Sequence, residues 1–397
     1  MNTYDWIVIG SGLTGAAVSY ELANAGFSVL LLDRADYPES ATRYSYGGIA
    51  YWSGTTELTR QLCQEGIAHH RSLSAELGQD TQFRETNLLL TIAPDRNPAE
   101  IAAKYTNCAI PPQILSPKDA HAIEPILNPE SIAGVLQFPH GHVFPEGIVS
   151  AYLNAFERLG GKSQVASVNG FIQSQGQITG VKTPTETYHG DRVLVCAGGM
   201  SRDLLKSVGV SVRLYFTQAE MIETVPIEPC LQSIVMPAET KRFEMEAAAG
   251  KAETDRLWDE VGHEVQPPIL DPGAVQLQDG RIRMGQWSRT LTSLTPQIDA
   301  ASSEQAIRQE VGQIMPTLKD VPGEWHLCLV SFSGDRLPLI GALPSVENLY
   351  LFSGFSNPFA ILPPLAKRFA HAMTGHTDPL IEQLSPLRFT VPPPPVD

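Results

Sequence analysis

Apolar residues follow two different periods along this chain. Continuous apolar runs with β-branched residues predict buried parallel strands at 6–9, 28–32, 192–196 and 349–352. Apolar residues at helical spacing predict amphipathic helices over 56–77, 146–159 and 304–318. Alternating positions at 213–225 and 281–287 predict strands of a second, mainly antiparallel sheet. Together the patterns predict an α/β chain, α+β overall, with two sheets.

The first predicted strand runs directly into the pattern G-x-G-x-x-G at Gly10, Gly12 and Gly15. Gly10 permits a tight turn, Gly12 lets the backbone approach a pyrophosphate, and Gly15 lets the next helix pack on the sheet. The second strand ends in Asp33, 18 residues after Gly15, where an acid receives ribose hydroxyls. An ordinary βαβ unit would leave this acid unexplained. The sequence therefore predicts a dinucleotide site that also includes Leu13, Thr14 and Arg34.

Two later strands also run into glycine-containing turns followed by helices. The strand at 192–196 is followed by Ala197 and Gly198, and the strand at 349–352 by Gly354, Phe355 and Ser356. The loop after Asp33 carries Arg43 and the pair Gly47-Gly48, which permits close approach of the backbone to a flat group. We expect these turns to return to the same site.

Composition limits the class of protein. A chain of 397 residues with 43% hydrophobic and 18% charged residues is typical of a globular protein of two domains. A net charge of −15 without a basic stripe argues against a nucleic-acid partner, and no apolar run has the length of a membrane span. Five scattered cysteines and a first strand that begins by residue 5 favour a cytoplasmic protein without a leader peptide.

Several histidines and one polar segment have no single interpretation. His69 and His70 lie on the predicted helix over 56–77, where packing is favoured over a ligand role. His140 and His142 have the spacing H-x-H, but no third metal ligand is near in the sequence. The polar stretch 241–261 predicts a helical excursion at the surface that could act as a lid.

The ordered set of motifs resembles the glycine oxidase, D-amino-acid oxidase and sarcosine oxidase (DAO) family of FAD-dependent oxidoreductases. The resemblance covers nearly the whole chain and rests on GSGLTG with Asp33, SATRYSYGG, FPEGIVSAYLNAFERLGG, RVLVCAGGMS, DRLPLIG and LYLFSGF. It implies a Rossmann-like FAD-binding domain of the glutathione-reductase type, built from 1–85, 145–212 and 326–397. It also implies a substrate domain with a mixed, largely antiparallel sheet, built from 86–144 and 213–325.

The resemblance further implies oxidation of a C–N bond in an amine or amino acid, with hydride transfer to flavin N5 and oxygen or a quinone as acceptor. Asp335 and Arg336 of DRLPLIG join the implied cofactor site. Five residues before Asp335, relatives carry an arginine that clamps the substrate carboxylate, but here that residue is Val330. Arg213, Arg283 and Arg289 are candidates to replace it.

Two further positions depart from the glycine oxidase pattern. Where glycine oxidases have Asn-Gly, this chain has Pro358-Phe359, which removes a backbone donor. Cys328 stands seven residues before Asp335, where the sarcosine oxidase branch attaches its flavin covalently, and a buried core cysteine is the other interpretation. Arg283, two residues before Gly285, matches a lysine that lies beside flavin N5 in that branch, and is therefore the candidate catalytic residue.

Two alternatives remain open from the sequence. One is flavin-dependent oxidation of a C–O bond in a hydroxy acid, which a histidine over the flavin, His263 or His326, would favour. The other is a flavin-binding protein without turnover, serving as a redox partner or assembly factor. Peripheral association with a membrane also stays open.

Overall fold

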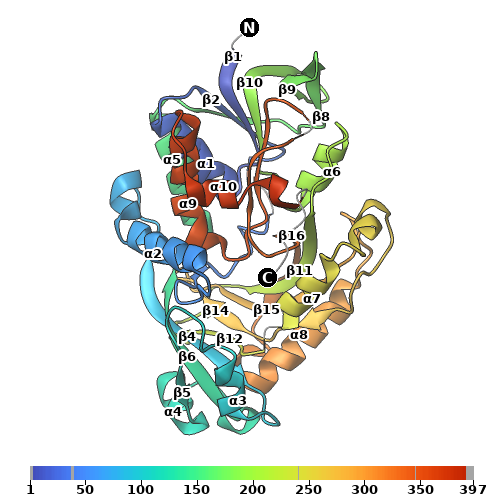
Figure 1. Ribbon diagram of the computed structural model, residues 1–397. Coiled ribbons are helices and arrows are strands. Elements are labelled where there is room, and N and C mark those ends of the chain that lie inside the picture. Colours follow the sequence, from blue (N-terminus) through green and yellow to red (C-terminus); the bar gives the residue numbers. More distant parts are fainter. Residues whose placement is uncertain (1–2, 37–39, 240, 345, 390–397) are drawn as a thin grey trace, which may run out of the picture.

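The computed structural model describes residues 3–36, 40–239, 241–344 and 346–389 (Figure 1). A first sheet has the strand order β17-β18-β10-β1-β2-β7, and the hairpin β8–β9 continues from β10. Its central strands are parallel, as the runs of apolar residues predict. The strands are β1 (Thr3–Ile9), β2 (Val29–Asp33), β7 (Lys162–Val165), β8 (Gly170–Ser174), β9 (Gln177–Lys182), β10 (Thr187–Val195), β17 (Leu339–Ala342) and β18 (Leu349–Ser353).

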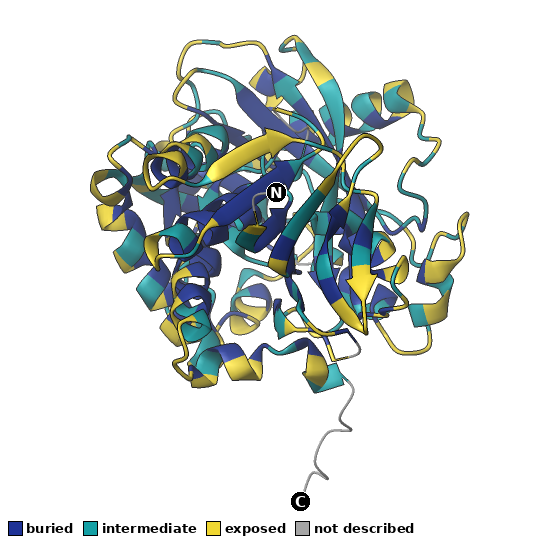
Figure 2. Cartoon of the chain, turned by 90° about the horizontal axis from the view of Figure 1, so that it is seen from above, coloured by how far each residue is buried: buried dark blue, intermediate teal, exposed yellow. Residues whose placement is uncertain are grey.

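Alternate residues of β1 enter two different cores. Trp6 and Val8 pack with the helices α1, α2, α5 and α9, whereas Ile7 and Ile9 pack toward β8, β9 and α6. Figure 2 shows the central strands as buried within these layers. The helices are α1 (Leu13–Asn24), α2 (Glu57–Leu77), α5 (Pro145–Arg158), α6 (Ser201–Lys206), α9 (Pro358–Met373) and α10 (Pro379–Gln383).

A second sheet has the order β16-β11-β15-β14-β12-β4-β6-β3, with β13 on β15 and β5 on β6. All its pairs are antiparallel except β12 with β4, so the expected mixed, largely antiparallel sheet is confirmed. Its strands are β3 (Gly48–Ile49), β4 (Arg84–Ile92), β5 (Gln113–Leu115), β6 (Gly134–His142), β11 (Leu214–Thr224), β12 (Ile234–Pro237), β13 (Ile269–Leu270), β14 (Ala274–Gln276), β15 (Ile282–Arg289) and β16 (Gly323–Ser333).

Helix α8 (Ala300–Ile314) covers one face of this second sheet, where Ile307 and Val311 pack with Ile222 and Met284. The remaining short helices are α3 (Pro98–Ala103), α4 (Pro117–Ile123), α7 (Lys241–Ala249) and the 3-10 turns η1 (Pro129–Ser131), η2 (Gly198–Met200), η3 (Asp255–Asp259), η4 (Pro316–Leu318) and η5 (Pro386–Phe389). Within the described residues, no helix is both long and apolar enough to cross a membrane.

Two short segments predicted for one domain pair with strands of the other domain's sheet. β3 and most of β16 come from segments that the sequence predicts for the FAD-binding domain, yet they hydrogen-bond to β6 and β11 of the second sheet. The division of the chain into two domains therefore stays a proposal. If the chain is divided this way, residues 48–49 and 326–333 belong to the FAD-binding domain by sequence but pair with strands of the substrate domain.

Helix α9 begins earlier than its sequence pattern suggests. The pattern places Pro363 and Pro364 in the first turn, but the helix starts at Pro358, so both prolines lie inside it. Without amide hydrogens they leave the carbonyls of Phe359 and Ala360 without helical partners. His70 Nε2 lies 2.6 Å from the Phe359 oxygen, and a Cβ at Gly66 would overlap the Ala360 oxygen. Helix α2 thus covers both carbonyls.

Candidate active site

The three motif glycines form a tight turn between β1 and α1. Gly10 has a φ of +104°, and a Cβ there would lie 2.6 Å from the Cys196 oxygen. A Cβ on Gly15 would overlap the carbonyl oxygen of Gly10. A Cβ on Gly12 would meet only Thr42 Oγ1, at 3.3 Å. The turn therefore holds an open backbone surface at Gly12, the N-cap of α1, which fits a bound pyrophosphate.

Asp33 lies at the carboxyl end of β2 beside this turn. One carboxylate oxygen accepts hydrogen bonds from the Ser11 amide and hydroxyl, at 2.6 and 3.0 Å. The next residue, Arg34, places Nη1 3.3 Å from Met200 Sδ at the end of η2. The segments around Gly12, Asp33 and Ala197-Gly198 are thus neighbours, as the sequence predicts for a dinucleotide site.

The loop 41–48 crosses from this turn to the second sheet. Leu13 donates its amide to Thr42 Oγ1 at 3.1 Å, and the Tyr44 ring stacks on His326 of β16 at 4.4 Å. The Arg43 guanidinium lies 5.2 Å from the Tyr44 ring. Gly47, with a φ of +70°, and Gly48 pass close to Val143 and His140.

Cys328 lies under this loop. It packs with Tyr44, Ala219 and Met221 and is 7% exposed. Burial raises the pKa of its thiol to about 12, and the nearby Arg283 only partly offsets this. Because a thiolate is the nucleophilic form, the protein environment disfavours the attack that a covalent flavin link requires. That link stays a prediction.

Arg283 is fully buried and bonded on three sides. Its Nε lies 2.8 Å from Glu223, one Nη lies 2.7 Å from Glu146, and the other lies 2.6 Å from the Ser45 carbonyl oxygen. Arg281 binds the same two carboxylates. The positive charge of Arg283 is therefore balanced by Glu146 and Glu223, and its guanidinium also contacts the loop 41–48 at Ser45. Its catalytic role stays a prediction.

The other two arginines considered for the substrate carboxylate are also engaged within the protein. Arg289 binds the buried Glu220 at 2.6 Å and lies over Trp287. Arg213 donates to the Gly250 carbonyl at 2.7 Å and lies over Phe389.

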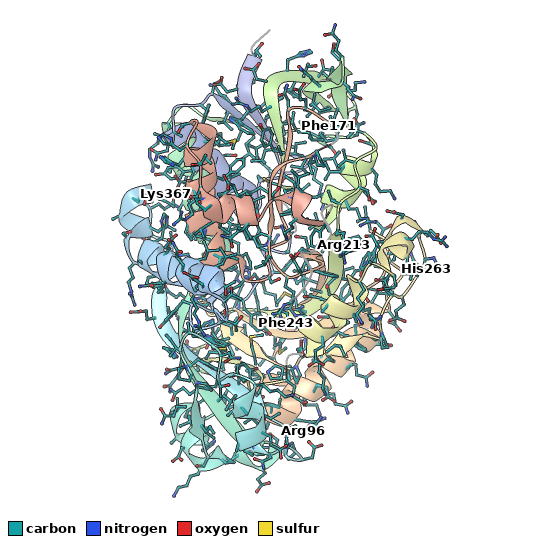
Figure 3. All side chains as sticks on the ribbon, viewed as in Figure 1. Arg96, Phe171, Arg213, Phe243, His263 and Lys367 are labelled. Atoms are coloured by element: carbon teal, nitrogen blue, oxygen red, sulfur yellow. The ribbon has the colours of Figure 1, made fainter. Side chains whose placement is uncertain are left out.

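A different arginine, Arg242, is linked by hydrogen bonds to the strand position opposite Val330. Val330 on β16 pairs with Thr217 on β11, whose hydroxyl donates to Glu246 of α7 at 2.9 Å. Arg242 binds the same Glu246 oxygen at 3.2 Å. The guanidinium carbons of Arg242 and Arg336 lie 4.6 and 4.4 Å from the Phe243 ring, which Figure 3 labels between the two sheets.

Sequence reasoning missed Arg242, Phe243 and Glu246 and assigned Arg336 to the cofactor site. Arg242, Phe243 and Glu246 lie on the helix α7 of the predicted surface excursion, far from Arg336 in the chain. The only local signal was their concentration in the charged stretch 241–261.

Asp271 faces the same group of charges. Burial and the neighbouring Glu246 raise the pKa of its carboxyl to about 6, against the opposing effect of Arg242 and Lys241. It also acts electrostatically on Tyr46, which donates its hydroxyl to the Gly285 carbonyl at 2.5 Å. A carboxyl with this pKa can exchange a proton near neutral pH.

The last two motifs lie side by side. Ser356 donates its hydroxyl to the Arg336 carbonyl at 3.0 Å, and the Phe355 ring packs on Phe352. Gly354 has a φ of +80°. Asp335 accepts two hydrogen bonds from Arg388, at 2.8 and 2.9 Å, so its contacts are structural.

The two histidines considered for a position over the flavin, His263 and His326, lie in different parts of the structure. His263 is exposed and pairs with Glu260, away from the loop 41–48, whereas His326 lies under Tyr44. Trp52 donates to His140 at 3.0 Å, and burial lowers the pKa of His140 and His142 to about 3. Among the described residues, neither histidine belongs to a group of three metal-ligating side chains.

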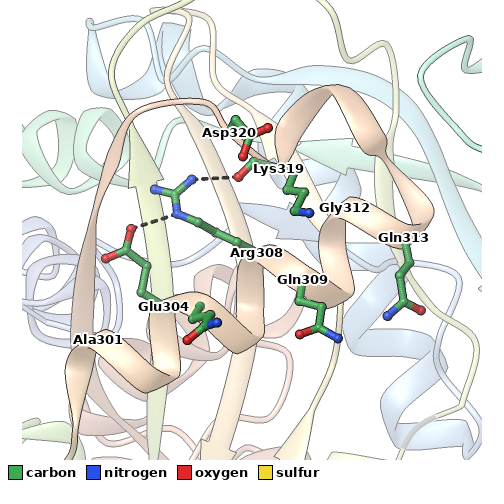
Figure 4. A pocket seen from close by; sticks show the side chains of 9 residues that line it. Ala301, Glu304, Arg308, Gln309, Gly312, Gln313, Lys319 and Asp320 are labelled. Carbon is green, nitrogen blue, oxygen red and sulfur yellow. Dashed lines mark hydrogen bonds and ion pairs between the residues drawn. The ribbon is translucent and has the colours of Figure 1, made fainter.

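A groove of about 670 Å³ lies elsewhere, on the outer side of α8 (Figure 4). Arg308, its central cation, binds Glu304 at 2.8 Å and the Val321 carbonyl at 2.7 Å. The groove is therefore not part of the site described above.

Comparison with known proteins agrees with this geometry. Residues 5–372 match the DAO family, described as FAD dependent oxidoreductase. A glycine oxidase of Pseudomonas aeruginosa is 24% identical over 390 residues, covering 95% of this chain and 96% of that protein. The uncharacterised oxidoreductase YurR of Bacillus subtilis is 24% identical over 363 residues, covering 88% and 89%.

Solved structures share the fold. Glycine oxidase from Geobacillus kaustophilus superposes with a TM-score of 0.76 at 19% identity, covering 97% of this chain and 98% of that one. L-proline dehydrogenase from P. horikoshii gives the same TM-score and identity, with 98% of each chain covered. The chain belongs to the DAO family of FAD-dependent oxidoreductases, and FAD is its cofactor.

Proposed function

We propose that this chain oxidises the C–N bond of an amino acid, including N-substituted or cyclic ones. Bound FAD would accept the hydride at flavin N5, and oxygen or a quinone would reoxidise it. The names of the relatives, which include glycine oxidases, an L-proline dehydrogenase and an iminodiacetate oxidase, support this class of substrate.

The residues that would hold FAD are those that the structure brings together around the turn after β1. The open backbone at Gly12 would face the pyrophosphate, and Asp33 would accept the ribose hydroxyls. The loop with Gly47 and Gly48 and the turn at Gly354 would lie along the flavin ring. These assignments follow the family and stay proposals.

The pair Arg242 and Arg336 carries the proposal for the substrate. The family's clamping arginine is replaced by Val330. Arg242 is linked through Glu246 to Thr217, which pairs with Val330, and Arg336 lies over the same Phe243 ring as Arg242. Arg336 has a φ of +67°, a backbone conformation that favours glycine and costs about 1–2 kcal/mol for other residues. Backbone conformations of this kind cluster at functional sites, although Gln82, Gln175 and Asn348 also have a positive φ here. We assign Arg336, with Arg242, to the substrate carboxylate.

Asp271 would accept the proton that the substrate ammonium loses. An ammonium must lose a proton before its carbon can release a hydride, and Asp271 is the carboxyl of raised pKa beside Arg242. Loss of that proton and then of one hydride leaves a protonated imine. The charged and titratable groups that influence Asp271 are Arg242, Lys241, Glu246 and Tyr46.

The reaction class is tested by anaerobic reduction of the flavin. The holoenzyme is mixed with glycine, sarcosine, proline and the matching hydroxy acids, and flavin absorbance is followed. We expect bleaching by at least one nitrogen compound. Bleaching by hydroxy acids alone would replace the proposal with C–O oxidation, and dithionite as the sole reductant would contradict both. Oxygen uptake then separates an oxidase from a quinone-coupled dehydrogenase.

The substrate assignment is tested with Arg336→Gly. Glycine relieves the positive φ, so the variant should be as stable as the wild type or about 1 kcal/mol more stable. The KM for the amino acid should rise at least about tenfold, because a charged hydrogen bond is lost. Arg256→Ala, at an exposed arginine of η3, is the control. An unchanged KM in Arg336→Gly would exclude its role.

A further inference from the structure

A second group of polar side chains lies away from the flavin site, between α1 and α2. Glu21 of α1 and His69 and Glu76 of α2 place one ligand atom each within 4.8 Å of one another. Tyr20 donates its hydroxyl to Glu76 at 3.3 Å. The proposed FAD function uses none of these residues.

Glu21 and His69 present buried polar atoms that meet no partner. Glu21 is 3% exposed, and its Oε1 has no hydrogen-bond partner among the described residues. The same holds for His69 Nε2, which lies 4.0 Å from Glu76 Oε2. The hydroxyl of the fully buried Tyr152 is also unpartnered, and it interacts electrostatically with both glutamates. Buried polar atoms of this kind are rare, because each costs about 1–3 kcal/mol.

The electrostatics of the group favour a cation. Glu21 is buried beside a second carboxylate, Glu76, with which it can share a ligand position. The buried, unpartnered Nε2 of His69 lies within reach of both and can donate a lone pair. Lys367 of α9, labelled in Figure 3, is exposed, and among the described residues no ion pair joins it to Glu21.

We propose that Glu21, His69 and Glu76 bind a divalent cation that links α1 to α2. One imidazole nitrogen and two carboxylate oxygens, with water as the fourth ligand, form a set that suits Zn²⁺. Bond lengths of about 2.0–2.2 Å require the three atoms to close in from their present separations. Glu76, the most exposed of the three, can move to achieve this.

The test uses the FAD-loaded full chain and Zn²⁺. After dialysis against Zn²⁺ and then metal-free buffer, we expect one bound zinc per chain by elemental analysis and a rise in Tm that a chelator reverses. Glu21→Gln keeps the side-chain shape and removes the charge, and His69→Asn removes the nitrogen ligand. Each should weaken zinc binding about tenfold to a hundredfold or more. Glu57→Gln, at an exposed acid of α2, is the matched control.

Either of two results would overturn the proposal: no zinc retained by the wild type, or equal zinc affinity in Glu21→Gln, His69→Asn and the wild type. A rise in Tm for Glu21→Gln together with no zinc in the wild type would identify a protonated carboxyl instead. Flavin content and amino-acid oxidation do not enter the readout, so failure of the proposed function would leave this test unaffected.

Discussion

Gly10, Gly12 and Gly15 belong to one motif but tolerate a side chain very differently. A Cβ at Gly15 would overlap backbone atoms, and Gly10 also has a left-handed φ. Gly12 has a φ of −61°, and a Cβ added there would contact only Thr42 Oγ1. Packing therefore requires glycine at Gly10 and Gly15, whereas at Gly12 the proposed pyrophosphate would be the reason for a glycine.

Gly12→Ala and Gly15→Ala should consequently separate folding from cofactor binding. Gly15→Ala should lower the free energy of unfolding by about 3 kcal/mol, since the backbone must move to admit a methyl group. Gly12→Ala should leave the stability of the FAD-free protein within about 0.5 kcal/mol but weaken FAD binding at least tenfold. Urea unfolding of the apoprotein and fluorescence titration with FAD measure the two effects. Full FAD affinity in Gly12→Ala would show that the pyrophosphate lies elsewhere.

At the scale of elements, one buried histidine contributes a hydrogen bond to the contact of α2 with α9, beside the ion pair of Glu65 with Arg368. His70 donates Nε2–H to the Phe359 carbonyl that Pro363 leaves open. Burial lowers the pKa of His70 to about 4. Since the unfolded chain binds the proton near pH 6.5, this stability is complete above pH 6.5 and is lost as the pH falls toward 4.

His70→Gln should remove this pH dependence while keeping a donor to the carbonyl. The stability of the wild type minus that of the variant should fall by up to about 1.4 kcal/mol per pH unit between pH 6.5 and 4. Urea unfolding at several pH values measures the slope. His376→Gln, at an exposed histidine, is the control. Parallel curves for the wild type and His70→Gln would mean that His70 is charged in the folded protein.

The strands β15 and β11 and the helix α5 meet in a buried ionic network. Among the described residues, Arg283→Met would leave Arg281 as the one ion-pair partner of Glu146 and Glu223. We expect a loss of about 3–5 kcal/mol in the free energy of unfolding. Adding Glu223→Gln to Arg283→Met should recover part of it. A loss below about 1 kcal/mol would show that this network contributes little to the free energy of unfolding.

At the scale of the whole molecule, the proposed cofactor site is built from segments that are far apart in sequence. The turn at Gly12, the loop 41–48, the turn at Gly198 and the turn at Gly354 come from separate parts of the chain. Bound FAD would therefore hold these segments together.

Removal of FAD should accordingly destabilise the entire fold. With free FAD at a hundred times its Kd, the free energy of unfolding should exceed that of the apoprotein by about 2.7 kcal/mol. Thermal unfolding at increasing FAD concentrations measures the effect, and Gly12→Ala is the control that should respond less. A Tm independent of FAD would contradict binding to the folded chain.

The sequence by itself determined the elements and the class of cofactor. Strand and helix periods, the glycine turn and Asp33 depend on residues near one another in the chain, and the structure confirms the two sheets. The packing partners of Arg283, His70 and Arg336 were decided only by the tertiary structure. Glu146 meets Arg283 from 137 residues away, and His70 meets the Phe359 carbonyl from 289 residues away. Such contacts depend on how faces pack, which local periodicity does not encode.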